Sequence, residues 1–368
     1  MLQRLSDRAL NRATLARQML LERSDMGIKD AVGFLLGLQG QQSHDPYIGL
    51  WTRLAPFAHP DLTALIVDRT LARGTTMRST LHLHTADDII GIREFVQPVI
   101  ERTWQGAFGK RRFGPNDKEA VRKAGIKLLD KSPMTSGELG KALQEQFPEG
   151  EPLAKAMLVQ TMEVLIQIPP TRIWGSGHAP ISTRVQNWLP RPHRRPIPRE
   201  TLVRRYLAAY GPASVMDMQA WCGMTKLGEV FQALRPELLT FEGEDGRELF
   251  DLPDAPRPDP EVPAPQRFLP LYDNVYLGFD NRRRMLEEND LKRVNMLGEY
   301  KPAVLVDGII SAGWSITDKK GAAVLDIEPY HTLRKSDLEP LQAEGLAFLK
   351  FMREDAASYD VRVLSPRA

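Results

Sequence analysis

The sequence contains one cysteine and no long apolar run. Cys222 alone cannot form an intramolecular disulfide, and its isolation excludes a cysteine-rich zinc site. No apolar stretch approaches the roughly 18 residues that cross a bilayer, and charged residues occupy the N-terminal region where a signal peptide has its apolar segment. We therefore expect a cytoplasmic protein without membrane association, in which Cys222 is a small core residue.

An excess of charge of one sign is also absent. The 49 lysines and arginines nearly balance the 47 aspartates and glutamates, which leaves a formal net charge of +2. Binding to a polyanion therefore requires that positive side chains gather locally. Such clusters are visible at residues 110–112, 190–199 and 282–284.

The order of sequence patterns predicts a mixed α+β protein of several units. The chain has 368 residues, of which 42% are apolar, enough for two to four small domains. Three successive stretches each have the pattern of three helices followed by a hairpin, which is typical of a winged helix. After a proline-rich segment at 253–266, the pattern changes to one typical of strands. We predict three tandem winged-helix domains at residues 1–113, 114–196 and 197–254, and a small C-terminal β-barrel at residues 255–368.

Local patterns define these units. The expected elements are helices over 5–21, 28–38, 46–54, 61–72, 86–105 with a break at Pro98, 116–130, 152–166, 199–210 and 337–353, strands over 172–175 and 268–277, and hairpins over 75–84, 238–252 and 304–311. Thr135 and Glu138 are spaced as in a capping box, and Ser214 is expected to begin another helix. Asp307-Gly308 is expected to form a hairpin turn.

Apolar side chains give way abruptly to amides within residues 35–46. The apolar helix pattern ends in glycines and glutamines and is followed by Asp45-Pro46. Residues i and i+2 point to different sides of a continuous helix, so a shared task for Gln39 and Gln41 requires the helix to end or distort here. The glycines permit that. From the pattern alone, a plain helix end followed by a polar turn remains the alternative.

Residues 77–84 alternate between polar and apolar side chains. This alternation places Arg78, Thr80, His82 and His84 on one face of a strand and apolar residues on the other. His82 and His84 have a spacing that metal ligands can use, but no nearby carboxylate or cysteine completes a set. We therefore favour a polar row that faces a phosphate backbone or a cleft.

Four motifs, in this order, resemble those of the AlkZ and YcaQ winged-helix DNA glycosylases. They are GLQGQ at 37–41, RSTLHL at 78–83, MD through W and G at 216–223, and LPLYDN at 269–274 with DNRRR at 280–284. The resemblance covers essentially the whole chain. It implies a C-shaped molecule of three winged helices bridged by a C-terminal β-barrel, which excises N7-alkylated purines and, in some members, unhooks interstrand crosslinks.

By this resemblance, Gln39 and Gln41 are catalytic. The alkylated purine is already cationic, so amides that orient a water toward C1′ and stabilise an oxocarbenium-like transition state are sufficient. The resemblance implies no metal and no cofactor. Lys29 lies a helix turn or more from the motif, which favours a monofunctional enzyme that leaves an abasic site. Gly40 departs from the family, whose middle residue is often aliphatic.

The implied partner is double-stranded DNA that carries alkylated purines, bound by a monomer without an obligate protein partner. The expected DNA-binding residues lie on the first hairpin and in the basic clusters: Arg78, Ser79, His82, Arg111, Arg112, Arg194, Arg282, Arg283 and Arg284. Two other classes remain open, because fold alone does not define function. One is a winged-helix DNA-binding regulator without catalysis, and the other is a scaffold held by protein partners.

Overall fold

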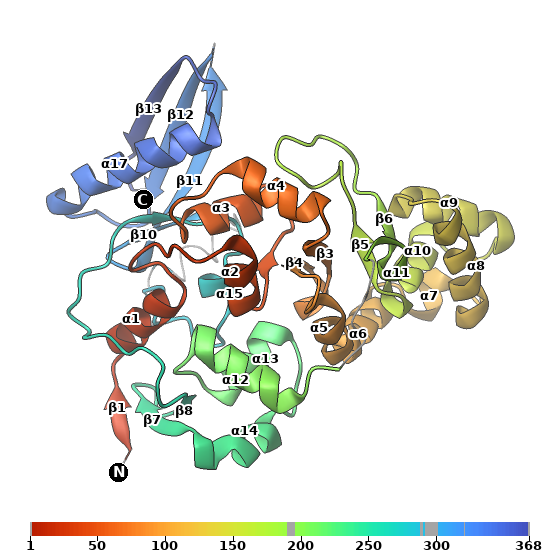
Figure 1. The fold of residues 1–368 in the computed structure, drawn as a ribbon, viewed down its shortest axis with the longest axis horizontal. Coiled ribbons are helices and arrows are strands. Elements are labelled where there is room, and N and C mark those ends of the chain that lie inside the picture. Colours follow the sequence, from red (N-terminus) through yellow and green to blue (C-terminus); the bar gives the residue numbers. More distant parts are fainter. Residues whose placement is uncertain (1, 190–195, 288–289, 291–300, 320, 367–368) are drawn as a thin grey trace.

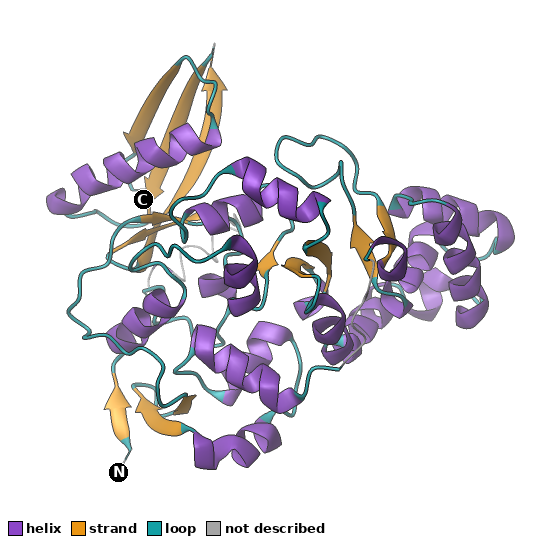
Figure 2. Ribbon diagram, viewed as in Figure 1, coloured by secondary structure: helices purple, strands orange, loops and turns teal. Residues whose placement is uncertain are grey.

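The computed structural model describes residues 2–189, 196–287, 290, 301–319 and 321–366. Figures 1 and 2 show a mixed α+β protein of helices and separate sheets. Two of its sheets have five strands and one has three. Among the helices of this described part, none has the length and apolar character needed to cross a membrane.

The N-terminal part contains helices and the beginning of the first sheet. Its elements are β1 (Gln3–Leu5), α1 (Asp7–Arg17), α2 (Ile28–Phe34), β2 (Leu38–Gln39), α3 (Asp45–Trp51), α4 (His59–Val67), β3 (Leu71–Thr75), η1 (Met77–Ser79), β4 (Leu81–Thr85), α5 (Ile89–Phe95), α6 (Gln97–Ala107) and α7 (Gly109–Phe113). The expected helix break near Pro98 is present, between α5 and α6. The hairpin differs from the one predicted over 75–84, because its first strand begins at Leu71. Its turn contains Arg78 and Ser79 with φ of 53° and 60°.

The middle of the chain is a helical unit whose strands join the first sheet. Its elements are α8 (Lys118–Lys131), α9 (Ser136–Gln146), α10 (Pro152–Met162), β5 (Leu165–Gln167), β6 (Ser182–Arg184) and α11 (Val185–Trp188). The first sheet has the order β2-β4-β3-β5-β6. The capping box of Thr135 and Glu138 is confirmed. The strand predicted over 172–175 is wrong: these residues form a loop after Pro169 and Pro170, which lack the N–H that a strand ladder needs.

The third part repeats helices and a hairpin. Its elements are α12 (Arg199–Tyr210), α13 (Val215–Cys222), α14 (Gly228–Leu234), η2 (Arg235–Glu237), β7 (Leu239–Gly243) and β8 (Glu248–Asp251). Ser214 and Asp217 form a second capping box. Strand β1 pairs in parallel with β7, so the N-terminus lies beside this hairpin (Figure 1). Cys222 is buried as expected, and burial raises the pKa of its thiol to about 12.

The C-terminal part is a curled sheet packed against a long helix. Its elements are β9 (Arg267–Phe268), α15 (Asn274–Leu277), β10 (Ala303–Val306), β11 (Ile309–Lys319), β12 (Ala322–Pro329), α17 (Lys335–Met352) and β13 (Ser358–Val363). In the described residues the order β13-β12-β11-β10-β9 leaves β13 and β9 at opposite edges, so the predicted barrel is a half-barrel. The strand predicted over 268–277 is largely a loop and α15, which begins where the Asp273 carboxylate accepts from Val275 N at 3.0 Å. The Asp307-Gly308 turn is confirmed, with positive φ at both residues.

Helix α1 buries two of its arginines. The side chains of Arg12 and Arg17 are both 0% exposed. Arg17 forms a bidentate ion pair with Asp251, with N–O distances of 2.6 and 2.8 Å. Arg12 donates to Asp307 at 2.5 Å and to Val262 O at 2.6 Å. These bonds connect α1 to β8, to the proline-rich segment and to the β10–β11 turn.

Two hydrophobic cores meet at the segment that precedes Gln39. Leu35 and Leu38 belong to one core, which also contains residues of α3, α4, α17 and the C-terminal sheet. Leu36 belongs to the other core, with residues of α5, α6 and α12–α14. The positive φ of Leu36, 58°, turns this side chain away from its neighbours. The segment is therefore packed on both sides.

Candidate active site

The helix before the glutamines ends where the sequence requires it to end. Helix α2 stops at Phe34, and the chain then enters β2, where Gln39 lies opposite His82 of β4. Gly40 N donates to Leu81 O at 2.8 Å, so the antiparallel ladder extends one residue beyond β2. The predicted irregularity before Pro46 is confirmed: Gln39 is the last residue of β2, and Gln41 lies in the bend that follows.

Gly37 lets the chain reverse into β2. Its φ is +97°, and a Cβ built at this position would lie 2.5 Å from the His84 ring and 2.9 Å from Leu83 O. Any larger residue would therefore strain the backbone and clash. Asn274 Nδ2 donates to Gly37 O at 3.0 Å, which ties the reversal to the first residue of α15.

The side chain of Gln39 is bound to an arginine inside the protein. Gln39 is 8% exposed, and its Oε1 accepts from Arg78 Nη2 at 2.8 Å. A guanidinium can only donate, so the atom that faces it must be the amide oxygen. Among the described residues, none accepts a hydrogen bond from Gln39 Nε2. The amide group is therefore oriented with its oxygen toward Arg78.

Arg78 connects three segments without a carboxylate partner among its hydrogen bonds in the described residues. Besides Gln39, it donates to Trp221 O of α13, and its Nη2 lies 3.3 Å from His82 Nε2. Burial lowers the pKa of Arg78 to about 10, so the guanidinium remains a cation at neutral pH. A buried cation among neutral acceptors is a strong hydrogen-bond donor.

The two histidines are buried, which corrects the exposed polar row expected from the alternation. His82 and His84 are each 1% exposed. The His82 Nδ1 proton faces Thr80 O at 3.1 Å, which leaves Nε2 to accept from Arg78. Burial holds the pKa of His82 well below its usual range and lowers that of His84 to about 4. Both rings are therefore neutral at physiological pH.

Gln41 lies on the surface, next to Arg172. Its side chain is exposed, and its backbone oxygen accepts from Arg172 Nη1 at 3.0 Å. A Cβ at Gly40 would lie 3.2 Å from Arg73 Nε and 3.3 Å from Pro46 Cγ. The buried Arg73 side chain therefore fills the space next to Gly40, where the resembled family often has an aliphatic residue.

The remaining motifs support this loop. Asp273 pairs with Arg53 at 2.7 and 2.9 Å in a site where both side chains are almost completely buried. Asp217 Oδ1 accepts from the backbone of Asp280 at 3.0 Å and of Asn281 at 3.3 Å. Residues 280–284 therefore form a turn against α13.

The expected DNA-binding residues differ in their surroundings. Arg111 and Arg283 are exposed, Ser79 and Arg112 are partly exposed, and Arg282 lies 4.5 Å from the Tyr276 ring centroid. Arg112 pairs with Glu151 at 2.7 Å. Arg284 is 3% exposed and donates to Pro212 O at 2.9 Å, so its side chain, like that of His82, is not presented to a phosphate. Arg194 lies outside the described residues.

Several residues around the loop have no sequence signal. Arg53, Arg73 and Arg172 stand outside the four motifs, and an isolated arginine in a sequence is ordinarily a surface residue. Asp45 is also buried, and it accepts from Gln42 N at 2.9 Å. Burial raises the pKa of Asp45 to about 7, an effect larger than the opposing influence of that hydrogen bond and of Arg73.

Replacing Asp45 with asparagine is expected to remove part of the pH dependence of stability. The unfolded carboxyl titrates near 3.8 and the folded one near 7, so its stabilising contribution is complete below pH 3.8 and is lost as the pH rises through 7. Between pH 5 and pH 8 we expect the wild type to lose about 2–3 kcal/mol more than Asp45→Asn, at about 1.4 kcal/mol per pKa unit. Urea unfolding at both pH values measures this. Asp61→Asn, an exposed change on α4, is the control, and equal losses in all three proteins would contradict the prediction.

Comparisons with known proteins identify the family and the fold. A family profile described as DNA glycosylase AlkZ-like matches residues 32–351. Among solved structures, the Streptomyces sahachiroi DNA glycosylase AlkZ has a TM-score of 0.73 and 19% identity, over 98% of this chain and 100% of that chain. Comparison with curated proteins gives no match.

The mixed α+β fold with its curled C-terminal half-barrel is therefore the fold of a DNA glycosylase. The chain belongs to the AlkZ-like DNA glycosylase family, which confirms the resemblance carried by the four motifs and identifies DNA as its substrate.

Proposed function

We propose that this protein hydrolyses the N-glycosidic bond of N7-alkylated purines in double-stranded DNA and leaves an abasic site. The observation that carries the proposal is the fixed carboxamide of Gln39, held by a buried arginine in the segment that also bears Gln41. Membership of the AlkZ-like DNA glycosylase family supports the interpretation of this geometry as part of a glycosylase active site.

The proposed chemistry depends on which side-chain atoms of Gln39 and Gln41 can still bind water or the substrate. Arg78 occupies Gln39 Oε1, so Gln39 offers its Nε2 protons and one lone pair, while the exposed Gln41 offers a complete amide. In this mechanism Gln41 orients the attacking water toward C1′ and Gln39 donates to that water; the glycosidic bond breaks with its electron pair neutralising the purine, and the water loses its proton to solvent. The cationic purine departs without strong acid catalysis. Fixed dipoles of this kind act without reorganisation during the reaction.

The position of Lys29 supports a monofunctional reaction. Lys29 lies on α2, outside the loop that carries the glutamines; its side chain is half exposed, and its Nζ lies 3.2 Å from Asp87 Oδ2. A lyase step would need an amine that attacks C1′. We propose that water is the only nucleophile.

The proposed scaffold is three tandem winged helices at residues 1–113, 114–196 and 197–254, followed by the half-barrel. Arg111, Arg282 and Arg283 are the proposed phosphate contacts, because their guanidinium groups lie at or near the surface. Contacts of this kind make affinity fall as salt concentration rises.

Base release from methylated duplex DNA tests the proposed function. We expect the wild type to release 7-methylguanine and to leave strands that break only after heating in alkali, as an unprocessed abasic site does. Undamaged duplex DNA should release no base. Sequence-specific binding to undamaged DNA with no release from methylated or crosslinked DNA would instead identify the regulator class. Crosslinked DNA in the same assay tests whether bulky adducts are also substrates.

A further inference from the structure

A loop of the middle helical unit holds the backbone of Gln41. Arg172 lies in this loop, between β5 and β6, and its Nη1 donates to Gln41 O at 3.0 Å across 131 positions of sequence. The side chain of Gln41 is exposed, and the described residues provide no hydrogen-bond partner for it. The direction of this carboxamide therefore depends on the backbone that carries it.

The peptide group that follows the Gln41 Cα is held at both ends. Arg172 binds its oxygen, and its N–H donates to Asp45 Oδ2 at 2.9 Å. The backbone is also held one residue earlier, where Gly40 N donates to Leu81 O at 2.8 Å. With fixed hydrogen bonds on both sides, the Cα of Gln41 has little freedom to shift while these contacts are intact.

Ionisable groups are buried beneath this exposed turn. Asp45 is 1% exposed, and Arg73, which donates to Ser43 O at 3.4 Å, is 2% exposed. Arg73 Nη1 and Arg172 Nε are buried and have no acceptor among the described residues. Buried ionisable groups with unused donors cost stability. Stability of the fold alone therefore does not account for this arrangement.

The loop keeps Arg172 in a strained and anchored conformation. Arg172 has a φ of +60°, in the left-handed region that residues with a Cβ rarely adopt. On one side Thr171 Oγ1 donates to Ile168 O at 2.6 Å, and on the other Trp174 N donates to Tyr47 Oη at 3.1 Å. Such conformations persist where the surroundings enforce them, and they cluster at functional sites. Here the enforced position is that of a guanidinium at the Gln41 carbonyl.

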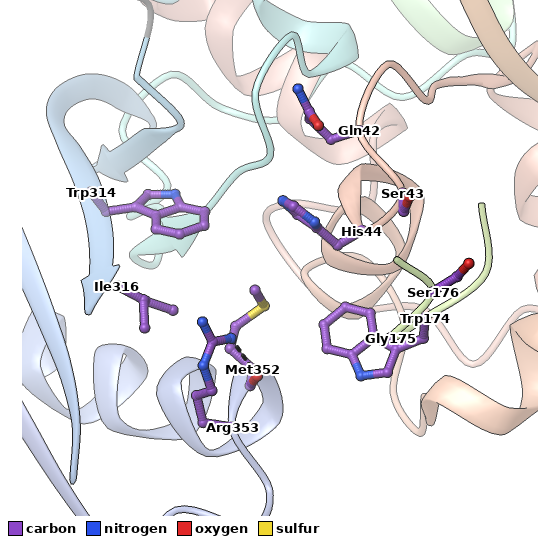
Figure 3. Close-up of a pocket in the computed structure, with 10 residues that line it drawn as sticks. All are labelled: Gln42, Ser43, His44, Trp174, Gly175, Ser176, Trp314, Ile316, Met352 and Arg353. Atoms are coloured by element: carbon purple, nitrogen blue, oxygen red, sulfur yellow. Dashed lines mark hydrogen bonds between the residues drawn. The ribbon is translucent and has the colours of Figure 1, made fainter. Parts of the chain in front are cut away.

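The same loop adjoins the turn beyond Gln41. The Trp174 ring stacks on His59 of α4, with centroids 3.7 Å apart, which fixes the loop to the N-terminal part. Residues 174–176 and 42–44 both line a cavity of about 450 Å³. Figure 3 shows these two segments on the same side of the cavity, across from Trp314. A displaced loop would therefore also change the surface that begins at the residue after Gln41.

We propose that Arg172 is a positioning residue for the reaction, which through the Gln41 carbonyl sets where the Gln41 carboxamide holds its water. This inference rests on the proposed function and makes the catalytic segment depend on the middle unit of the chain. In this role Arg172 touches neither the water nor DNA. Its removal should therefore slow the chemical step and leave DNA binding unchanged.

Single-turnover release of 7-methylguanine from methylated duplex DNA measures this step. We expect Arg172→Met to lower the rate about tenfold to a hundredfold, because a displacement of about 1 Å in an active site costs up to about 10²-fold. The half-saturating enzyme concentration should not change. Arg172→Lys keeps a donor without the planar fork and should restore the rate in part. In a Gln41→Ala background, Arg172→Met should cause no further loss, because the group that it positions is gone.

Arg69 provides the matched control. It also has a positive φ, of 72°, and its Nη1 donates from the N-terminal part to the middle unit, at 3.1 Å from Trp188 O. Arg69→Met should keep the wild-type rate. Hydrogen exchange read by mass spectrometry tests the contact independently of catalysis. Exchange of residues 40–46 should become faster in Arg172→Met and not in Arg69→Met, while the rest of the chain exchanges as in the wild type.

The outcomes distinguish this inference from the proposed function. An active wild type whose rate is unchanged in Arg172→Met, or an equal loss with and without Gln41→Ala, would overturn the positioning role and leave the glycosylase proposal standing. A change in the half-saturating concentration alone would overturn it as well, by making Arg172 a DNA contact. Faster exchange at 40–46 in Arg172→Met, with a wild type that releases no base, would keep Arg172 as the residue that fixes Gln41 and overturn the glycosylase proposal.

Discussion

Replacing Gln39 or Gln41 with alanine is expected to lower the rate of 7-methylguanine release by about 10²–10³-fold, the usual loss when one preorganised donor of an active site is removed. Gln41→Ala removes the amide assigned to the water, and Gln39→Ala removes the group that Arg78 orients. Single-turnover kinetics on methylated duplex DNA measures the chemical step. Gln232→Ala, an exposed glutamine change on α14, should keep the wild-type rate.

A glutamate at position 39 separates the role of Gln39 in the reaction from its role in folding. Gln39→Glu keeps an oxygen for Arg78, converts the contact into an ion pair and removes the two amide donors. We therefore expect a variant at least as stable as the wild type whose rate is nearly as low as that of Gln39→Ala. Wild-type activity in Gln39→Glu would show that only the acceptor matters, and would contradict the assignment of Gln39 as a donor.

Arg78→Met should reproduce much of that loss in kcat with little change in KM, because Arg78 acts through the orientation of Gln39. Arg78→Lys, which keeps the charge but not the planar fork, should restore the rate only in part. A rise in KM alone would indicate that Arg78 contacts DNA phosphate, as the sequence first suggested.

Replacing Asp273 with alanine is expected to lower the free energy of unfolding by about 3–5 kcal/mol, because it leaves the buried guanidinium of Arg53 without its carboxylate. The same change removes the cap of α15, whose Asn274 holds the Gly37 carbonyl. Urea unfolding measures the stability, and base release should fall with it.

The matched control is an exposed ion pair. Arg204 and Glu237 lie 2.7 Å apart with side chains 40% and 58% exposed, so Glu237→Gln should cost less than about 1 kcal/mol. If Asp273→Ala costs no more than this control, the buried pair contributes nothing beyond a surface contact.

Features governed by neighbours in the chain could be predicted from the sequence. The capping box at Thr135, the Asp307-Gly308 turn and the helix end before Gln39 each depend on residues within a few positions. The prediction that Cys222 is a core residue also needed no distant partner, because a single cysteine is most often a small buried residue. The strand predicted at 268–277 failed because a local cap at Asp273 outweighed an apolar pattern.

Partners that are distant in sequence could not be predicted. Arg17 and Asp251 are 234 positions apart, and Arg53 and Asp273 are 220 apart, so no periodicity marks either arginine as buried. The resemblance predicted a catalytic role for Gln39 and Gln41, which stays a proposal, and it predicted that Arg78 binds DNA. The positive φ at residues 78 and 79 instead accompanies a side chain bonded to Gln39, and such a conformation has no signature in the residue types.

The position of residues 35–38 between two cores has a consequence for synthesis of the protein. Each core combines residues near this segment with residues made much later: one adds residues of the helices at 202–234, and the other adds residues of strands and a helix beyond residue 300. The glutamine segment leaves the ribosome early, but part of each core that packs against it is made much later. A nascent chain therefore carries both glutamines before the packing around residues 35–38 is complete.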